Sequence, residues 1–342
     1  MNDIIKHADN TTIIPEGTDI SQIREWTDTV KWPKSILEKI DPNKILEEAK
    51  HPTEMDDLHK RGLTGKNINI AIIDQNLYLE HPEYKDRIKH YEKVGQWPAG
   101  NPLDYHGSLV VGCAVGKTTG SAPDANIYYV AANQWVPNGK FAIKNLQSGH
   151  RLFNNMAIRR VLEINKTLPD KDKIRFLSCS WGKPDDQFKE ESDKLFDECK
   201  KNGIMVLGGD YTKTESRPCN KFGISTKMNI DVTEKVKDRV GIPTDCKTTP
   251  YFEGGYVYVV NGGPSSTYPY LAGVFACALQ NNQLFFTRQN WQDDLLEIMK
   301  ETATNAPNGS KMINPSGIEQ RVSELTREME NNLIKEQRLQ NE

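Results

Sequence analysis

Four short apolar runs recur along the middle of the chain, at residues 67–74, 126–132, 174–180 and 203–209. Each is rich in β-branched or aliphatic residues and lacks the alternation of apolar and polar residues that is typical of a strand with one solvent-exposed face. Unbroken apolar runs of this length are typical of strands that are buried on both faces of a sheet. The pattern therefore predicts a mainly parallel central sheet.

Longer stretches of a different periodicity lie between and after these runs. Residues 149–168 carry apolar side chains at helical spacing, and residues 185–201 form a more polar helix-like stretch. Residues 251–263 read as a hairpin with a Glu-Gly-Gly turn, and the small-residue stretch 265–282 reads as a closely packed helix. Strands that alternate with helices indicate an α/β fold with helices on both faces of the sheet.

The two ends of the chain differ from this middle part. Residues 1–60 read as a helical N-terminal extension, in which Asp41 and Pro42 have the pattern of a helix N-cap and first residue. Ile20, Ile23 and Trp26 also recur at helical spacing, so we expect an arm packed on the main domain rather than a separate module. Residues 319–342 form a charged C-terminal tail with one apolar stripe, as in a docked solvated helix or, alternatively, a helix that binds a partner.

Composition narrows the possible environment and partners. The 342 residues include 44 Lys plus Arg and 47 Asp plus Glu, which gives a net charge of −3 and no reason to expect nucleic-acid or membrane binding. No apolar run approaches the ~18 residues of a membrane span, and the polar start does not resemble a signal peptide. The six cysteines form no CxxC pair. We therefore expect a cytoplasmic protein without a zinc site or disulfide framework.

Reactive side chains lie near the ends of the predicted strands, where sites form in open α/β sheets. Asp74 and Asp210 end the first and fourth runs, and His106 and Ser265 lie in glycine-containing segments. An acid, a histidine and a serine are the parts of a nucleophilic triad, in which imidazole accepts the serine proton and the carboxylate orients the imidazole. By themselves these residues also fit plain structural roles: a strand-end cap, a surface-loop histidine and a helix N-cap.

The residues that flank them resemble a known family. The segments IAIIDQNLYLEHPEY, YHGSLVVG, GSAPDANIYYV, FLSCSWG and GGPSSTYPYLAG occur in the order of the motifs of subtilisin-like serine proteases, the subtilases of peptidase family S8. Asp, His and Ser also follow each other in the subtilisin order. The resemblance covers roughly residues 60–318, so we assign residues 61–318 to a subtilisin-like peptidase domain. It implies a three-layer α/β fold.

The resemblance also implies roles for individual residues. Asp74, His106 and Ser265 would form the triad, with Ser266 as the rival nucleophile, and Ser265 is preferred because the family serine lies two residues after the motif glycine. The oxyanion hole would be made by the Ser265 N–H and by residue 210. The substrate backbone would add as a strand to segments that contain Ser180, Trp181, Gly182, Leu207, Gly208 and Gly209.

The chain departs from the family pattern at two positions of the site. Asp210 replaces the usual Asn, and an ionised carboxylate cannot donate a hydrogen bond to an oxyanion. Pro264 replaces the usual Thr before the serine, which removes a hydroxyl and an N–H. The segment CAVGKTTGS, where the family often binds calcium, has no acidic residue, so we expect no metal there. No other cofactor is implied.

Two functional hypotheses follow, with a peptide or protein as the partner in both. The first is an intracellular serine endopeptidase that works through an Asp/His/Ser triad and an acyl-enzyme. The alternative is a weak or inactive pseudoprotease of the same fold that binds peptides as a scaffold or regulator, which Asp210 and Pro264 favour. An esterase is disfavoured because no segment resembles an α/β-hydrolase nucleophile elbow. Either terminal extension is a possible contact for a further partner.

Overall fold

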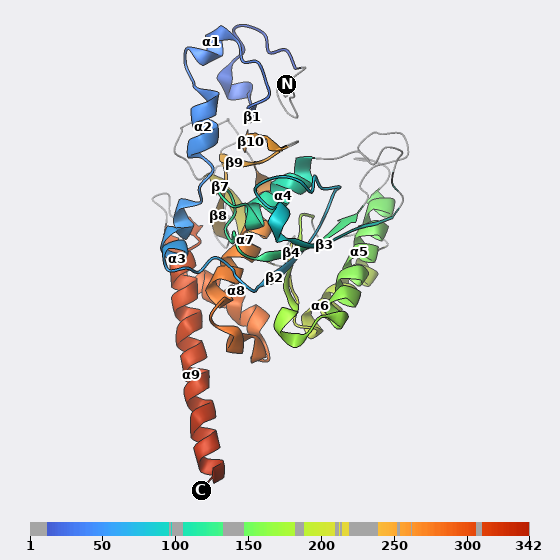
Figure 1. Ribbon diagram of the computed structural model, residues 1–342, viewed down its shortest axis with the longest axis vertical. Helices are drawn as coiled ribbons and strands as arrows, with labels where there is room; N and C mark the ends of the chain where they lie inside the picture. The colour runs from blue at the N-terminus through green and yellow to red at the C-terminus, as the bar shows by residue number, and fades with distance from the viewer. Residues whose placement is uncertain are drawn as a thin grey trace.

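The structure is a computed structural model that describes most of the chain. The described residues are 12–95, 97, 105–132, 147–181, 188–208, 212, 214–218, 239–251, 254–260, 262–305 and 310–341. The α/β body lies in the middle, the N-terminal segment at one end of the long axis and the last helix at the other (Figure 1).

A five-stranded parallel sheet forms the centre of the body, in the order β3-β4-β2-β5-β6. Its strands are β2 (Asn69–Asp74), β3 (Ile88–Val94), β4 (Asn126–Ala132), β5 (Ile174–Cys179) and β6 (Met205–Leu207). The four strands that the apolar runs predict are therefore confirmed. The edge strand β3 was not predicted, because its residues are mostly polar and only partly buried.

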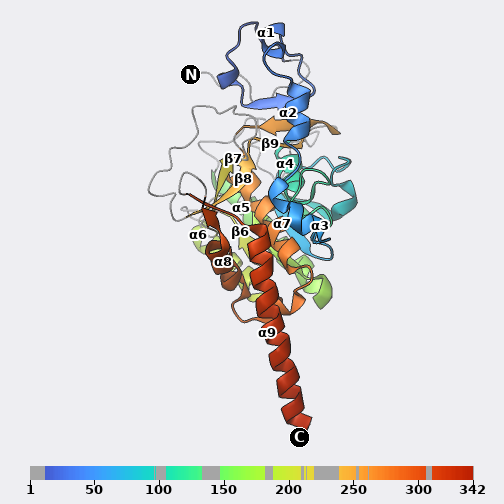
Figure 2. The same cartoon turned by 90° about the vertical axis from the view of Figure 1, so that its left-hand side faces the viewer.

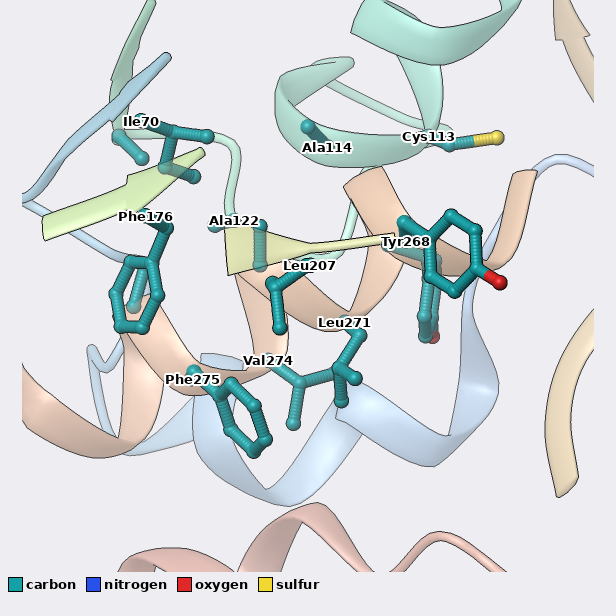
Figure 3. Packing of buried hydrophobic residues seen from close by; sticks show 14 of the residues in the cluster. Ile70, Cys113, Ala114, Ala122, Phe176, Leu207, Tyr268, Leu271, Val274 and Phe275 are labelled. Atoms are coloured by element: carbon teal, nitrogen blue, oxygen red, sulfur yellow. The ribbon is translucent and has the colours of Figure 1, made fainter. Parts of the chain in front are cut away.

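Successive side chains of a strand point to opposite faces of a sheet, and here both faces are covered by helices. Ile70 and Ile72 of β2 pack with α4 (Tyr105–Val115) and α7 (Gly263–Leu279), a cluster that Figure 3 shows from close by. Ala71 and Ile73 face the other way, toward α5 (Gln147–Thr167) and α6 (Lys189–Lys201). This confirms the three-layer α/β fold.

Two smaller sheets border the body. One has the order β11-β12-β8-β7, with β7 (Thr214–Pro218), β8 (Val240–Asp245), β11 (Thr304–Asn305) and β12 (Lys311–Met312). The other has the order β1-β10-β9, with β1 (Glu25–Thr27), β9 (Lys247–Pro250) and β10 (Tyr256–Val259). Strands β9 and β10 are antiparallel and form the predicted hairpin, which begins a few residues earlier than the sequence suggested.

The N-terminal segment is built from short elements, of which the first four pack on this hairpin and the last two pack on the body through Met55 and Leu58. They are η1 (Ile20–Gln22), β1, α1 (Lys34–Leu37), α2 (Pro42–Glu48), η2 (Thr53–Met55) and α3 (Asp56–Lys60). The predicted cap is confirmed, because the Asp41 side chain accepts hydrogen bonds from two α2 amides. The predicted helix through Ile20, Ile23 and Trp26 is wrong. Trp26 belongs to β1, since its segment pairs with β10 instead of coiling on itself.

The C-terminal part contains α8 (Trp291–Thr302) and α9 (Pro315–Asn341). Ile318 and Val322 of α9 are buried against the body, whereas residues 330–340 are exposed. Figures 1 and 2 both show this second half of α9 projecting away from the body. Among the residues that the structure describes, no helix has the length and apolarity needed to cross a membrane.

Candidate active site

Asp74 and His106 form the centre of the candidate site. Asp74 is the last residue of β2, and its side chain is 1% exposed. Its Oδ1 accepts hydrogen bonds from His106 Nδ1 at 2.6 Å and from the Gln75 amide at 2.8 Å. With the proton held on Nδ1, the neutral imidazole of His106 carries its lone pair on Nε2 and can act there as a base.

His106 is the second residue of α4 and not part of a surface loop, although its side chain remains 22% exposed. The following glycine lets this helix start close to the end of β2. A Cβ on Gly107 would lie 2.9 Å from the Tyr129 hydroxyl and 3.0 Å from the Asn76 carbonyl oxygen. A glycine is therefore required after His106 for steric reasons, since a larger residue at position 107 would push the histidine away from Asp74.

Ser265 lies in the first turn of α7, which packs against α4 in the core. It is partly exposed, and its carbonyl oxygen accepts a hydrogen bond from Ser180 Oγ at 3.2 Å. This contact joins the start of α7 to the carboxyl end of β5. The approach of Ser265 Oγ to His106 stays a prediction.

The rival serine faces the interior. Ser266 is 1% exposed, and its Oγ donates a hydrogen bond to the Gly262 carbonyl oxygen at 3.2 Å. The same hydroxyl lies against the buried thiol of Cys113, whose pKa is raised to about 11 because of burial, an effect that Ser266 partly offsets. Ser266 is thus withdrawn from any substrate, and this environment favours Ser265 as the nucleophile.

Four of the six predicted substrate-lining residues are described. Ser180 and Trp181 follow β5, and Leu207 ends the neighbouring β6, where it pairs in register with Ser178. The Leu207 side chain is buried in the cluster of Figure 3, so only its backbone can meet a substrate. A Cβ on Gly208 would lie 2.6 Å from the Cys179 carbonyl oxygen, so a residue with a side chain does not fit at this position.

Three predicted site residues lie outside the described residues: Gly182, Gly209 and Asp210. The predicted role of Asp210 in the oxyanion hole therefore stays a prediction. The other predicted oxyanion donor, the Ser265 N–H, belongs to the N-terminal turn of α7, where helix amides have no partner within the helix.

The loop after α4 is held by a carboxylate that the sequence reading did not single out. Both Glu83 oxygens accept hydrogen bonds from Thr118, at 2.7 Å from its N and 2.6 Å from its Oγ1, and Oε1 also accepts one from the Tyr256 hydroxyl at 2.7 Å. Glu83 thus ties the segment after β2 to the α4 end and to β10. Within the described ranges, no group of three or more His, Cys, Asp or Glu residues could hold a metal ion.

The described cysteines are buried and form no disulfide with one another: Cys113, Cys179, Cys199, Cys246 and Cys277. Burial raises the pKa of Cys199 to about 12, so this thiol is not poised as a nucleophile.

The chain is similar to known proteins in part of its sequence and in its fold. The sequence model of the subtilase family, peptidase S8, matches residues 65–208, which include Asp74 and His106 but end before Ser265. The protein has the subtilisin-like fold. No curated protein matches the chain.

Several solved structures resemble this subtilisin-like protein at low sequence identity. The prenylagaramide maturation protease PagA has a TM-score of 0.57 and 14% identity, over 78% of this chain and 98% of its own. The PatG macrocyclase domain has a TM-score of 0.55 and 13% identity, over 81% and 96%. Fervidolysin from Fervidobacterium pennivorans, described as a keratinolytic enzyme, has a TM-score of 0.51 and 15% identity, over 82% and 44%. At these identities the similarity concerns the fold alone.

Proposed function

We propose that the chain is an intracellular subtilisin-like serine endopeptidase that cleaves peptide bonds through Asp74, His106 and Ser265. The observation that carries the proposal is the 2.6 Å hydrogen bond between Asp74 and His106, which directs the basic Nε2 of the histidine away from the carboxylate. A buried acid paired with a partly exposed histidine suits proton transfer to and from a substrate.

In this mechanism, His106 Nε2 accepts the Ser265 Oγ proton while Oγ attacks the scissile carbonyl carbon. The resulting imidazolium is stabilised by Asp74 and gives its proton to the departing amine. The acyl-enzyme ester is then hydrolysed by water, whose proton passes to His106 and returns to Ser265 as the carboxylic acid leaves. The oxyanion at each tetrahedral stage is met by the Ser265 N–H and by the side chain of residue 210.

The substrate is a peptide or protein that binds in extended form beside the carboxyl ends of β5 and β6. Backbone groups around Ser180 and Leu207 would pair with it as an added strand. The fold neighbours include enzymes described as a maturation protease and a macrocyclase. We therefore propose maturation of a specific peptide ahead of general protein turnover.

A pseudoprotease that only binds peptides is the second candidate. Two residues, Asp210 and Pro264, favour it in the sequence, and the structure describes the second of them. Pro264 lies within the first two positions of α7, where a helix has no partner for the missing N–H and tolerates proline well. The missing N–H of Pro264 therefore does not weigh against activity. Asp210 remains the residue that favours the alternative.

Labelling with a fluorophosphonate probe tests the proposal directly. We expect the wild type and Ser266→Ala to react with the probe and to cleave a peptide library, and Ser265→Ala to do neither. Because Ser265 is partly exposed, its hydroxyl contributes little to folding, and the Tm of Ser265→Ala should stay within a few degrees of the wild type. Labelling that survives in Ser265→Ala but disappears in Ser266→Ala would show that Ser266, and not Ser265, is the nucleophile. A wild type that binds peptides without reacting would support the pseudoprotease.

A further inference from the structure

Asp245 is a carboxylate that lies at the start of the nucleophile helix without belonging to it. It is the last residue of β8, and its Oδ1 accepts hydrogen bonds from the Gly262 N–H at 2.8 Å and from the Gly263 N–H at 3.2 Å. Gly262 is the N-cap residue of α7 and Gly263 its first residue. Asp245 thus caps, from another strand, the turn that leads to Ser265.

This turn lacks a cap of its own. Gly262 has no side chain that could accept hydrogen bonds from the helix amides. Gly263 has a φ of +57°, a conformation that glycine adopts without strain and that its own backbone does not fix. The tight packing explains the glycine at 262, because a Cβ there would lie 2.6 Å from the Thr244 carbonyl oxygen. Gly262 and Gly263 are separated from Ser265 by Pro264 alone, and the freedom of these two glycines calls for an external restraint to hold one geometry.

A second contact ties the same two segments together. The Cys246 N–H donates to the Val260 carbonyl oxygen at 3.2 Å, and Cys246 itself has a φ of +55°. A positive φ at a residue other than glycine costs free energy, and it persists only where the surroundings impose it. Here it turns the chain from β8 into β9 so that Asp245 faces the glycine amides.

We propose that Asp245 is a positioning residue that holds Ser265 in register for attack by fixing the Gly262–Gly263 turn. The proposal rests on the proposed function of Ser265 as the nucleophile. Asp245 acts through two backbone amides and not on the substrate. The carboxylate also complements the positive end of the α7 dipole.

The test compares Asp245→Ala with Asp245→Asn, which keeps a side-chain oxygen acceptor. A displacement of about 1 Å at a nucleophile can lower rates by about 10²-fold, so we expect Asp245→Ala to lower kcat about 10²-fold with little change in KM. Asp245→Asn should restore kcat to within about fivefold of the wild type, because the acceptor matters more than the charge. Asp41→Ala is the matched control: it removes a carboxylate that caps α2 in the same way, outside the site, and should leave kcat unchanged.

Hydrogen exchange separates this proposal from the proposed function. In Asp245→Ala the Gly262 and Gly263 amides should exchange about tenfold faster or more, while amides in the second half of α7 keep their protection. Unchanged exchange at both glycines, or a kcat of Asp245→Ala equal to that of the wild type, would overturn the positioning role. An inactive, unlabelled wild type whose glycine amides still depend on Asp245 would instead refute the nucleophilic role of Ser265 while confirming the restraint.

Discussion

Asp74 Oδ1 and His106 Nδ1 lie 2.6 Å apart, although the two residues are separated by 32 positions in the chain. The pair exists because β2 ends where α4 begins and because Gly107 permits the close approach of that helix. The other carboxylate oxygen, Oδ2, is buried and accepts no hydrogen bond among the described residues. The negative charge of Asp74 is therefore directed mainly at the imidazole.

Replacement of Asp74 by Asn tests this relationship. The amide can place its NH₂ toward the ring, which favours the tautomer with the proton on Nε2 and leaves no base for Ser265. We expect kcat to fall by about 10⁴-fold at neutral pH, as for the equivalent change in serine proteases of known mechanism. Steady-state kinetics with a chromogenic peptide measure it. A loss of less than tenfold would show that His106 is not the general base.

The roles of this pair were predicted from the resemblance of the flanking motifs to those of subtilases, and a local pattern predicted the place of Asp74 at the end of a strand. Asp74 ends an unbroken apolar run, and runs of that kind form parallel strands whose carboxyl ends meet at the site. Asp245 and Glu83 were not predicted, because their partners are backbone and side-chain groups that only the tertiary fold brings near. The same holds for β1, whose three residues form a strand only because β10 is beside them.

The N-terminal segment is expected to be a permanent part of the fold. Trp26 is fully buried, stacks on Trp32 with ring centroids 4.5 Å apart, and belongs to a cluster with Tyr258 of β10. Trp26→Ala should lower the free energy of unfolding by about 3–5 kcal/mol, because it removes a large side chain from a packed interior. Denaturant unfolding measures this change.

Truncation after Glu330 provides the contrasting variant. Residues 331–340 of α9 are exposed, so the loss of this part should change the free energy of unfolding by less than about 0.5 kcal/mol. If Trp26→Ala were as stable as this truncation, the N-terminal segment would be a loosely attached arm.

His81 is expected to make stability depend on pH. It is fully buried beside Tyr84 and Tyr256, and this burial lowers its pKa, which a hydrogen bond with the Gly255 carbonyl oxygen partly offsets. The unfolded chain therefore binds a proton more readily than the folded chain. Stability is fully present above the unfolded pKa of about 6.5 and is lost as the pH falls from there toward the lower folded pKa.

The measurement is the Tm between pH 7 and pH 5 for the wild type, His81→Gln and Tyr84→Phe. His81→Gln should flatten the fall in Tm over this interval. Tyr84→Phe removes hydroxyl contacts with Tyr78 and Ser108 at the same place, and it should lower the Tm without changing the slope. Equal slopes in the wild type and His81→Gln would rule out His81 as the titrating group.

The contacts of Glu83 with the loop after α4 lead to two predictions, one for a chelator and one for a mutation. Because its carboxylate already binds the N–H and hydroxyl of Thr118, the loop does not need a cation to close. We expect EDTA to leave the Tm unchanged and Glu83→Ala to lower stability by about 1–3 kcal/mol, since Thr118 would lose its buried acceptor. A Tm that falls with EDTA and recovers with calcium would contradict this and reveal a calcium site.

The aspartate at position 210 leads to a prediction for the pH dependence of activity, which follows from the sequence. The transition state requires His106 to be neutral and residue 210 to donate a hydrogen bond. A free imidazole is neutral above about pH 6.5, whereas an aspartic acid donates only when it is protonated, ordinarily below about pH 4. The two requirements conflict, so an active enzyme should have its pH optimum on the acidic side of the usual range for subtilases.

Asp210→Asn removes the conflict because an amide of nearly the same shape donates at any pH. It should raise kcat by up to about 10²-fold, the scale on which one oxyanion donor acts, and most strongly at alkaline pH. The profile of kcat/KM against pH for both forms measures this, with Asp245→Asn as a control for the loss of a carboxylate near the site. An unchanged profile would mean that residue 210 does not face the oxyanion. A loss of activity at every pH would mean that the carboxylate of Asp210 takes part in the reaction in another way.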